Sequence, residues 1–363
     1  TSRDPGVAVL KGLEILLDRS GVVAGDVSGI LHATTVATNA VLERKGAATG
    51  LITTEGFRDV LIIGRQKRYE TYDLYINKPE PLVQRRHIVE VTERLDFDGS
   101  VVTELDSASV DRAIDTMVGA GRETVAVALM HAYANPAHEE AIRARIQERA
   151  LDISVSISSE ISPKFREYER TSTTVANAYV KPIVERYIAN LEAALAARGF
   201  ENELFVMQSS GGLVSTDIAR DYPIRIIESG PAAGVLMGAS VGLSEGTEHV
   251  ITFDMGGTTA KLGAVDGGTP AIMSTFEVGH VRYKKGSGLP INVPSVELLE
   301  IGAGGGSIAR VEMGMIVVGP ESAGADPGPI CYGLGGARPT ITDANVALGY
   351  IAPDWFNAGA MTL

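Results

Sequence analysis

The residues from Val250 to Val265 combine the groups that a phosphate site needs. An apolar run ends at Asp254, two glycines and two threonines follow, and a second largely apolar run then begins. This order predicts a strand, a tight turn and a returning strand, with backbone N–H groups and two hydroxyls free at the bend. Gly256 and Gly257 can adopt positive φ and let an anion approach closely, and Asp254 could hold magnesium through water. An ordinary hairpin would fit the same residues.

Two further segments carry groups that could meet a nucleotide. Gly211 and Gly212 follow the apolar run LFVMQ, so they could face ribose, phosphate or a substrate carbonyl, or could simply end a strand. Pro231 in ESGPAAG marks the start of a helix, whose free N–H groups favour an anion. The candidate binding residues there are Ser229, Gly230 and Ala232. The alternative is tight packing of small residues between a helix and a sheet.

The segment GAGGGSIAR, from Gly302 to Arg310, is rich in glycine but is followed by a strand pattern. A P-loop or a dinucleotide-binding fingerprint would need a helix after the glycines, so the sequence argues against both. We therefore expect a flexible hinge or a loop that faces the substrate.

Four side chains outside these segments are candidates for chemistry. Asp326 lies in a Pro-Gly-Pro turn and Asp343 lies near a helix start, so each could act in catalysis or could merely form a turn or a cap. His32, at a strand end close to two threonines, could orient a substrate or a phosphate. Cys331 is the single cysteine and has no identifiable neighbouring base, which disfavours a nucleophilic role. The histidines show no metal-ligand spacing.

These segments occur in one order with others along nearly the whole chain. Together they strongly resemble the A-subunit family of hydantoinases and 5-oxoprolinases, which also includes subunits of ATP-dependent ketone carboxylases. The segments that carry the resemblance are HATTVATNAVLERKG, SSEISPKFREYERTSTTVANAYVKP, VMQSSGG, ESGPAAGV, FDMGGTTAK, VELLEIGAGGGSIARV, GPESAGADPGPICYG and PTITDANVALG.

The resemblance implies an α/β fold of the actin-like, sugar-kinase-like ATPase type, with two phosphate-binding hairpins and an inserted αβ unit. Residues 1–200 would form the first ATPase half and the inserted unit, and residues 201–363, with strands from about Leu204 onward, would carry the second hairpin. Members of the family usually have a first hairpin before the region that matches the start of this chain, and further segments after its end. We therefore expect a piece of a longer polypeptide, truncated at both ends.

The resemblance also implies ATP and Mg²⁺ as cofactors. Asp254 would act in catalysis and hold the magnesium ion, and Asp326, Asp343 and His32 are the other catalytic candidates. Lys261 is a candidate cation for the phosphates, unless strand alternation turns it to solvent. The residues expected to cradle phosphate are Gly256, Gly257, Thr258 and Thr259.

The expected reaction is ATP-dependent opening of a five-membered cyclic amide, such as hydantoin, an N-substituted hydantoin or 5-oxoproline, through phosphorylation of the carbonyl. One alternative is an ATP-dependent ketone carboxylase subunit of the acetone or acetophenone type. Another is a nucleotide-binding assembly subunit that completes no reaction alone. A B-type subunit is the partner that the resemblance implies, in a heteromer.

Composition limits the partners and the location. A net charge of −13 argues against nucleic acid and against an anionic membrane as partners. No apolar run has the length of a membrane span, and a single cysteine suggests a reducing compartment. We expect an acidic, cytoplasmic enzyme subunit that acts on a small molecule.

Strand and helix patterns alternate along the chain, as in α/β folds. The expected elements include a helix capped by Asp4, a helix closed by Gly46, a hairpin at Asp98 and Gly99, and an αβαβ unit over residues 109–160. A long helical stretch over residues 165–199 should break near Pro182. TTVATNAV from Thr34 and TTVANAYV from Thr173 could be an internal repeat, or could share only a helix-start pattern.

Overall fold

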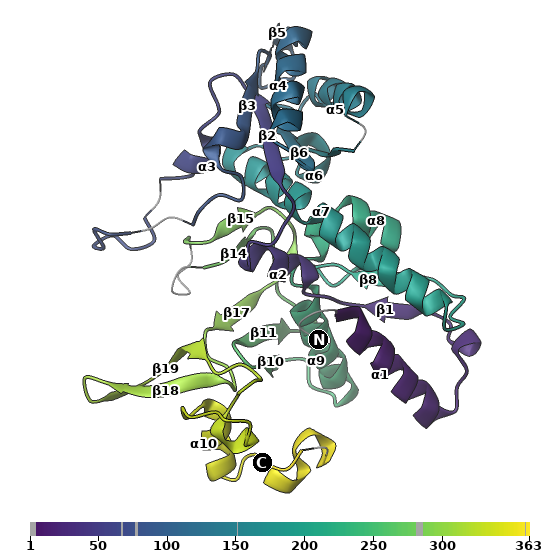
Figure 1. The fold of residues 1–363 in the computed structure, drawn as a ribbon, viewed down its shortest axis with the longest axis vertical. Helices are drawn as coiled ribbons and strands as arrows, with labels where there is room; N and C mark the ends of the chain where they lie inside the picture. The colour runs from purple at the N-terminus through teal and green to yellow at the C-terminus, as the bar shows by residue number, and fades with distance from the viewer. Residues whose placement is uncertain (1–4, 67, 77–78, 151, 281–285, 360) are drawn as a thin grey trace. The chain divides into compact units, whose positions relative to one another are not determined.

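The computed structural model describes residues 5–66, 68–76, 79–150, 152–280, 286–359 and 361–363 (Figure 1). The chain divides into two compact units. The first is Thr1–Ala233 with Ile272–Ser295, and the second is Gly234–Ala271 with Val296–Leu363. Each unit is described by itself below.

The first unit contains a parallel four-stranded sheet in the order β3-β2-β6-β7. The strands are Ile88–Val91, Thr49–Thr54, Thr124–Ala128 and Ser154–Ile157. Helices α4 (Ser107–Gly119) and α5 (Ala137–Arg149) alternate with the last two strands along the chain. This alternation confirms the predicted αβαβ unit, which β2 and β3 extend into a larger sheet.

Helices cover both faces of this sheet, as a parallel sheet requires. On one face, Ile114 of α4 and Ile142 of α5 belong to the same buried cluster as Val127 of β6. On the other face, Leu51 of β2 clusters with Val175 of the long helix α7 (Glu167–Ala196). All six residues of β2 are buried, which fits its run of apolar and β-branched residues.

The long helix α7 is continuous over 30 residues with Pro182 inside it, so the predicted break near this proline is wrong. Proline removes one backbone hydrogen bond and normally kinks a helix. Here Val180, Val184 and Ile188, on both sides of the proline, are almost fully buried. Packing along the helix therefore outweighs the local preference for a break.

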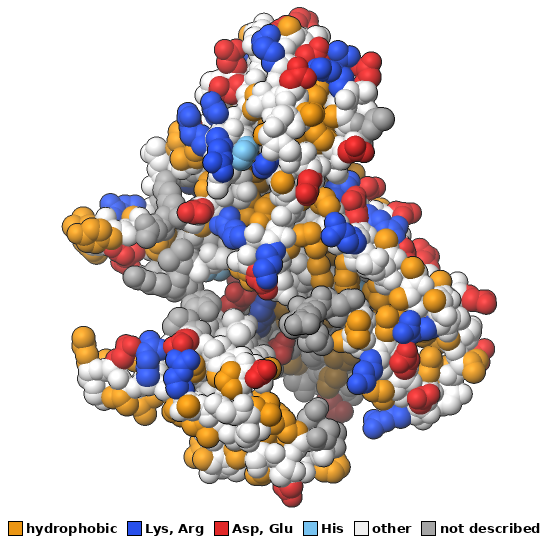
Figure 2. Space-filling model, viewed as in Figure 1, with side chains coloured by type: hydrophobic (Ala, Val, Ile, Leu, Met, Phe, Trp, Pro, Cys, Tyr) orange, Lys and Arg blue, Asp and Glu red, His pale blue; other side chains and the backbone are white. Residues whose placement is uncertain are grey.

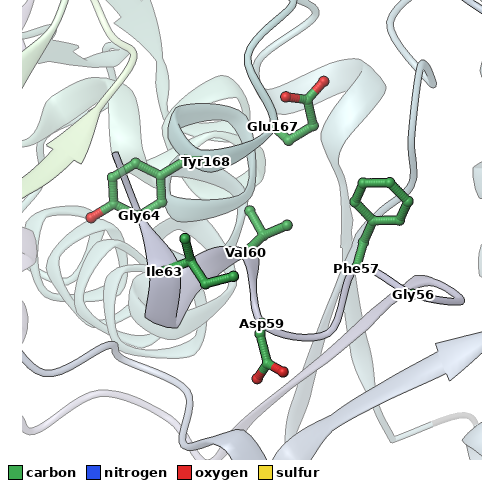
Figure 3. A pocket seen from close by; sticks show the side chains of 8 residues that line it. All are labelled: Gly56, Phe57, Asp59, Val60, Ile63, Gly64, Glu167 and Tyr168. Atoms are coloured by element: carbon green, nitrogen blue, oxygen red, sulfur yellow. The ribbon is translucent and has the colours of Figure 1, made fainter. Parts of the chain in front are cut away.

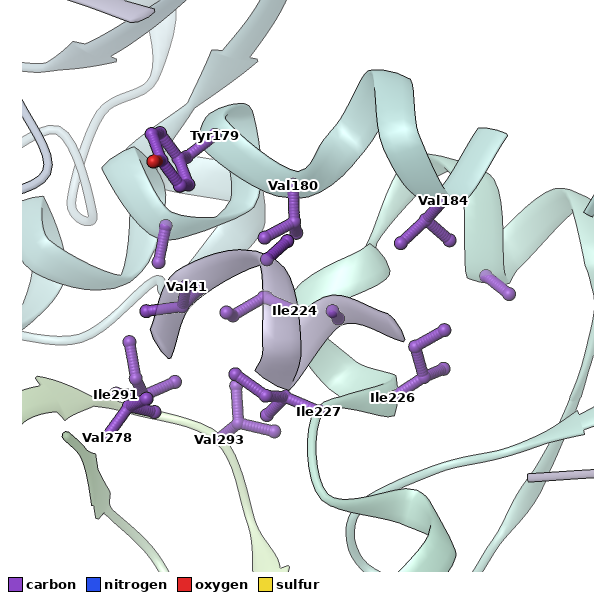
Figure 4. Packing of buried hydrophobic residues seen from close by; sticks show 14 of the residues in the cluster. Val41, Tyr179, Val180, Val184, Ile224, Ile226, Ile227, Val278, Ile291 and Val293 are labelled. Carbon is purple, nitrogen blue, oxygen red and sulfur yellow. The ribbon is translucent and has the colours of Figure 1, made fainter. Parts of the chain in front are cut away.

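A second core of the first unit joins α7 to three other elements (Figure 4). These are α2 (Val36–Leu42), the 3₁₀ turn η3 (Pro223–Ile226) and the antiparallel pair β14–β15 (Phe276–Val278 and Leu289–Ile291). Helix α2 ends four residues before Gly46, so the predicted helix end is wrong. Arg44 already has a positive φ of 55°, and a Cβ at Gly46 would lie 2.0 Å from the ring of Tyr179. Gly46 is therefore needed for close packing.

A small sheet, β1-β8-β9, also belongs to the first unit. Strand β8 (Leu204–Met207) pairs in parallel with β1 (Ile30–His32) and antiparallel with β9 (Leu213–Ser215). This pairing places the strand at Leu204 in the first unit. The predicted division into residues 1–200 and 201–363 is based on regions of the sequence and not on compact units, and it stays a prediction.

Helix α1 (Pro5–Ser20) packs through Leu10 against Leu191 and Leu195 of α7. The predicted cap Asp4 lies outside the described residues. The hairpin expected at Asp98 and Gly99 is confirmed by β4 (Arg94–Leu95) and β5 (Val101–Thr103), with Gly99 at a φ of 86°.

The second unit is built on an antiparallel sheet. Strand β11 (Ala260–Asp266) pairs with β10 (Val250–Met255), with β12 (Thr269–Pro270) and with β17 (Leu298–Ile301). Helix α9 (Ser229–Ser244) packs closely on β10. A Cβ at Gly238 of the helix would lie only 2.3 Å from the side chain of Thr252 on the strand. The unit also contains the hairpin β18–β19 (Ser307–Glu312 and Met315–Ser322) and the helix α10 (Ile341–Ala347).

The remaining described elements are short. They are η1 (Ala24–Asp26), α3 (Val60–Ile63), η2 (Arg85–His87), α6 (Ser158–Ile161), α8 (Thr216–Asp221), β13 (Ile272–Met273), β16 (Ser295–Val296), η5 (Ile330–Tyr332) and η6 (Pro353–Gly359). Acidic and basic side chains are interspersed on the face drawn in Figure 2. In the described part of the chain, no helix is both long and apolar enough to span a membrane.

Candidate functional site

The predicted hairpin at residues 250–265 is confirmed. β10 and β11 pair antiparallel from Val250 opposite Val265 to Met255 opposite Ala260. The N–H of Gly256 donates to the carbonyl of Thr259 at 2.9 Å and closes the bend. Neither Gly256 nor its neighbour Gly257 has a positive φ, so the bend does not use the conformational freedom that glycine allows.

The carbonyls of the bend are held by the glycine-rich segment that follows β17. The N–H of Gly305 donates to the carbonyl of Gly256 at 2.9 Å, and the N–H of Gly306 donates to the carbonyl of Gly257 at 2.8 Å. A Cβ at Gly304 would lie 2.6 Å from both the Gly256 oxygen and the Thr258 nitrogen. The segment is therefore packed against the bend, and the expected flexible hinge is wrong.

The bend offers hydrogen-bond donors that the described part of the chain does not use. Among the described residues, no hydrogen bond engages the N–H groups of Gly257, Thr258 and Thr259, or the hydroxyls of the two threonines. Thr258 is exposed and Thr259 is half-buried. Two bend carbonyls accept from Gly305 and Gly306, while three N–H groups find no partner in the described ranges. This arrangement suits an anion, because successive N–H groups form a nest for phosphate oxygens.

Three charged side chains form a row beside the bend. Asp254 on β10 lies opposite Lys261 on β11, which lies opposite Glu300 on β17. Directly paired residues project from the same face of a sheet. The Lys261 ammonium lies 3.0 Å from the Glu300 carboxylate, and the lysine side chain is only 16% exposed. The alternative that Lys261 turns out to solvent is therefore wrong.

Asp343 is tied to its own surroundings. It forms a capping box with Thr340 at the start of α10. Its carboxylate also accepts from the N–H of Cys331 at 2.7 Å and from the N–H of Ile330 at 3.3 Å. Burial alone would raise the pKa of Asp343, but the hydrogen bonds from Cys331 and Thr340 outweigh it. The pKa of Asp343 therefore lies below its usual value. Asp326, by contrast, is exposed.

Cys331 is a protonated thiol at neutral pH. Burial, followed by the neighbouring Asp343 carboxylate, raises the pKa of the Cys331 thiol to about 11. A nucleophilic cysteine needs a lowered pKa or an adjacent base. The thiol of Cys331 has the opposite property, which agrees with the low weight given to this residue from the sequence.

The candidate site residues of the first unit lie at the end of β1, where His32 is found, and at the start of α9, where Ser229 is found. His32 accepts or donates a hydrogen bond with the Tyr187 hydroxyl at 2.8 Å, and burial lowers the pKa of its imidazole. The fully buried Ser229 binds the backbone N–H and carbonyl of Thr34, at 3.1 and 3.0 Å. The helix start at Ser229 agrees with the expectation. However, the N–H of Ala232 donates to the carbonyl of Glu228 inside the first turn. The expectation that this N–H is a free donor is therefore wrong.

The other bend, at Gly211 and Gly212, joins β8 to β9. The carbonyl of Gly212 accepts from the N–H of Gln208 at 2.7 Å, and Gly211 has a φ of 91°. The adjacent Ser209 is buried and its hydroxyl donates to the carbonyls of Arg225 and Ile227. This bend is thus the turn of a hairpin, and a role in ligand binding stays a prediction.

The sequence did not point to the residues that hold the bend in place. Gly305, Gly306 and Glu300 meet the hairpin through the pairing of β17 with β11 and the turn after it. Thr342 then holds the glycine segment, because its N–H and its hydroxyl both donate to the Gly305 carbonyl at 2.9 Å. The sequence marks glycines here, but not the register that brings them to the bend.

Comparisons with known proteins give the same family along the chain. The hydantoinase/oxoprolinase family model matches residues 170–363, and the model of the hydantoinase/oxoprolinase N-terminal region matches residues 1–150. The chain therefore belongs to the hydantoinase/oxoprolinase family.

Several relatives show the range of this family. The caprolactamase subunit alpha of Pseudomonas jessenii is 36% identical over 370 residues, which are 100% of this chain and 52% of that protein. The solved structure of that ATP-dependent caprolactamase has a TM-score of 0.82, at 36% identity over 97% of this chain and 51% of that one. The acetophenone carboxylase gamma subunit of Aromatoleum aromaticum is 35% identical over 100% of this chain and 51% of its own.

A nucleotide-free structure of acetone carboxylase, solved in a study of ATP-dependent acetone carboxylation, also has a TM-score of 0.82, at 26% identity over 100% of this chain and 52% of that one. The chain thus spans about half the length of these relatives. Its mixed α/β fold is the fold of both solved neighbours, and its family includes amide hydrolases and ketone carboxylase subunits.

Proposed function

We propose that this chain is the ATP-binding part of an ATP-dependent cyclic amidohydrolase, and that the bend from Gly256 to Thr259 holds phosphate. One observation carries the proposal. Among the residues that the structure describes, the bend leaves three N–H groups and two hydroxyls without partners, while Gly305 and Gly306 hold two of its carbonyls. Donors that are fixed in advance stabilise phosphate charge without reorganisation during the reaction.

The proposal extends to the fold. An actin-like ATPase places a phosphate hairpin at the bend of an antiparallel sheet, and residues 201–363 would supply the second of two such hairpins. The antiparallel pairing of β10 and β11, and the packing of α9 on β10, support this assignment. A Ser229–Gly230 contact to nucleotide at the start of α9 remains part of the proposal.

Asp254 is the proposed magnesium residue. Mg²⁺ usually keeps several waters and takes one or two carboxylates together with substrate phosphates. The described residues contain no group of three His, Cys, Asp or Glu side chains placed to hold a metal. A single exposed carboxylate at the end of β10 fits the water-mediated mode. The ion would offset phosphate charge, and Lys261, already paired with Glu300, would add a partly neutralised cation.

ATP coupling answers a chemical difficulty, since an amide carbonyl is a poor electrophile. The carbonyl oxygen attacks the γ-phosphorus, the bond from that phosphorus to the β–γ bridging oxygen breaks, and ADP leaves. A first water then adds to the activated carbon, and cleavage of the ring C–N bond frees the amine and leaves an acyl phosphate. A second water adds to the acyl carbon, and phosphate departs with the former carbonyl oxygen to leave a carboxylate. The N–H groups of the bend would hold the phosphates in line, which is the main protein contribution to phosphoryl transfer.

Substitutions at the bend test the proposal in the full-length protein with its genomic neighbour. We expect Thr258→Val and Asp254→Ala to weaken binding of MgATP, or to lower substrate-dependent ADP release, by at least roughly tenfold. Thr247→Val, at an exposed threonine of the same unit, is the matched control and should behave as wild type. Unchanged turnover in both bend variants would rule out these roles.

Carboxylation of a ketone is the second candidate function. It is favoured by the similarity to the acetophenone carboxylase gamma subunit and to the structure of acetone carboxylase. A screen for ADP release separates the candidates, with hydantoins, 5-oxoproline and lactams on one side and ketones with bicarbonate on the other. Stimulation by a ketone with bicarbonate alone would overturn the first choice.

A B-type subunit is the proposed partner, and the cytoplasm is the proposed location. If the chain binds ATP alone but turns it over only with its partner, the two chains divide the reaction between them. If the two chains assemble but ATP binds neither to this chain alone nor to the complex, this chain is a structural subunit. Roles of His32 and Asp326 in catalysis remain proposals that the same assay can test through His32→Gln and Asp326→Asn.

A further inference from the structure

A cavity of about 330 Å³ lies in the first unit, in the size range of small-molecule sites. It lies between the loop that follows β2, the helix α3 and the first turn of α7 (Figure 3). In open α/β sheets, ligands bind outside the carboxyl ends of parallel strands. The residues that line the cavity are Gly56, Phe57, Asp59, Val60, Ile63, Gly64, Glu167 and Tyr168.

The walls of this cavity are largely apolar. Phe57, Val60 and Ile63 supply hydrocarbon surface, and the ring of Tyr168 lies against Gly64, where a Cβ would be 3.3 Å from the ring. Burial, followed by the nearby Glu169, raises the pKa of the Tyr168 phenol, so the phenol is neutral at physiological pH. These walls would accept a ring or a short aliphatic chain.

Glu167 is a carboxylate among the residues that line the cavity. Asp59 is held by Arg85, whose Nε and Nη2 donate at 2.6 and 2.9 Å, and in Figure 3 its carboxylate points away from Glu167. Glu169, two residues further along α7, is paired with Arg65. By contrast, no hydrogen bond or ion pair within the described residues reaches the half-buried Glu167, although the charge of Arg170 acts on it.

We propose that this cavity binds a small molecule with an apolar ring and an N–H donor, the donor facing Glu167. A carboxylate only accepts hydrogen bonds, so it favours a ligand with a donor such as N–H and disfavours an anion. A lactam and a cyclic amine share this chemistry. The choice of a lactam rests on the proposed function, whereas the cavity and its carboxylate do not.

Three probes of similar size test the site in the full-length protein without nucleotide. They are 2-piperidone, N-methyl-2-piperidone and piperidine as its cation, each titrated by saturation-transfer NMR. We expect saturable binding of 2-piperidone and at least roughly tenfold weaker binding of its N-methyl analogue, which lacks the donor. Piperidinium distinguishes a charged from a neutral N–H source.

Variants assign the binding to this cavity. Glu167→Ala should weaken 2-piperidone by at least roughly tenfold, whereas Glu167→Gln should keep the acceptor and abolish any preference for piperidinium. Ile63→Phe, at a half-exposed position, should fill the cavity and remove binding. Glu201→Ala, at an exposed carboxylate of the same unit, is the matched control.

Three results would overturn the proposal. The first is the absence of saturable binding for both N–H probes. The second is equal binding of the methylated and unmethylated lactams, and the third is binding that survives both Glu167→Ala and Ile63→Phe. Thr258→Val should bind the probes as wild type does, so failure of the ATP proposal would leave this measurement unaffected.

Discussion

Asp343 and Cys331 show how residues that resemble active-site groups can have a structural role. The Asp343 carboxylate accepts from the backbone of Thr340, Ile330 and Cys331 and from the Thr340 hydroxyl. An acid that accepts this many hydrogen bonds has its charged form stabilised, and it is a weak general base. We therefore expect Asp343 to hold the loop around Cys331 against α10.

The reactivity of Cys331 tests this local environment. Because the pKa of its thiol is about 11, the thiolate is scarce at pH 7.5 and becomes abundant only as the pH approaches that value. We expect slow labelling by iodoacetamide at pH 7.5, with a rate that keeps rising past pH 9, measured by mass spectrometry of the native protein. Cys331→Ala should retain ATP turnover. Rapid labelling at pH 7.5 that saturates below pH 8 would contradict the assignment.

At the scale of elements, hydrogen bonds connect the bend to the glycine segment, this segment to α10, and α10 to the loop at Cys331. Gly305 and Gly306 hold the bend, Thr342 at the start of α10 holds Gly305, and Asp343 beside it holds the loop at Cys331. Hydrogen bonds through consecutive elements fix the direction in which the free N–H groups point. The glycine segment and α10 would therefore act as supports of the phosphate site.

Gly304→Ala tests the close approach of the glycine segment. The added methyl would meet the Gly256 oxygen and the Thr258 nitrogen at 2.6 Å, and such overpacking costs about 1–3 kcal/mol. We expect a lower melting temperature and weaker MgATP binding. Gly234→Ala, in the helix α9 with open space around it, is the control and should stabilise by about 0.5–1 kcal/mol. Equal behaviour of the two variants would contradict the packing.

Thr342→Val removes the hydroxyl that donates to Gly305, while the backbone N–H bond remains. We expect a loss of about 1 kcal/mol in the free energy of unfolding, measured by chemical denaturation. The KM for ATP should rise more than kcat falls, since Thr342 positions the bend and does not touch the reacting atoms. Thr342→Ser should restore both parameters, and a valine variant with wild-type ATP kinetics would contradict this role.

The sequence predicts these elements where the signal is local. Alternation and turn residues identify the hairpin at residues 250–265, and hydrophobic spacing identifies α4, β6 and α5. It fails where distant packing decides. The burial around Pro182 keeps α7 continuous, and the pairing of β17 with β11 places Glu300 beside Lys261. Neither effect has a signature within a short window of residues.

At the scale of the whole molecule, membership in the family supports the proposed class of reaction, and the local geometry supports the proposed place of phosphate binding. Membership in the hydantoinase/oxoprolinase family makes ATP-dependent chemistry on an amide or a ketone the expectation. The geometry of the bend supports the proposal that phosphate binds there, in a chain that spans about half the length of its relatives. The central claim is therefore that the bend of β10 and β11 holds the phosphates of ATP.

Hydrogen–deuterium exchange with and without MgADP and a non-hydrolysable ATP analogue tests that claim most directly. We expect the amide hydrogens of Gly257, Thr258 and Thr259, which are unpaired among the described residues, to exchange more slowly when nucleotide is bound. Thr258→Val should reduce this protection, and Thr247→Val should leave it intact. Nucleotide binding that protects other segments and leaves the peptide spanning residues 254–262 unchanged would contradict the account.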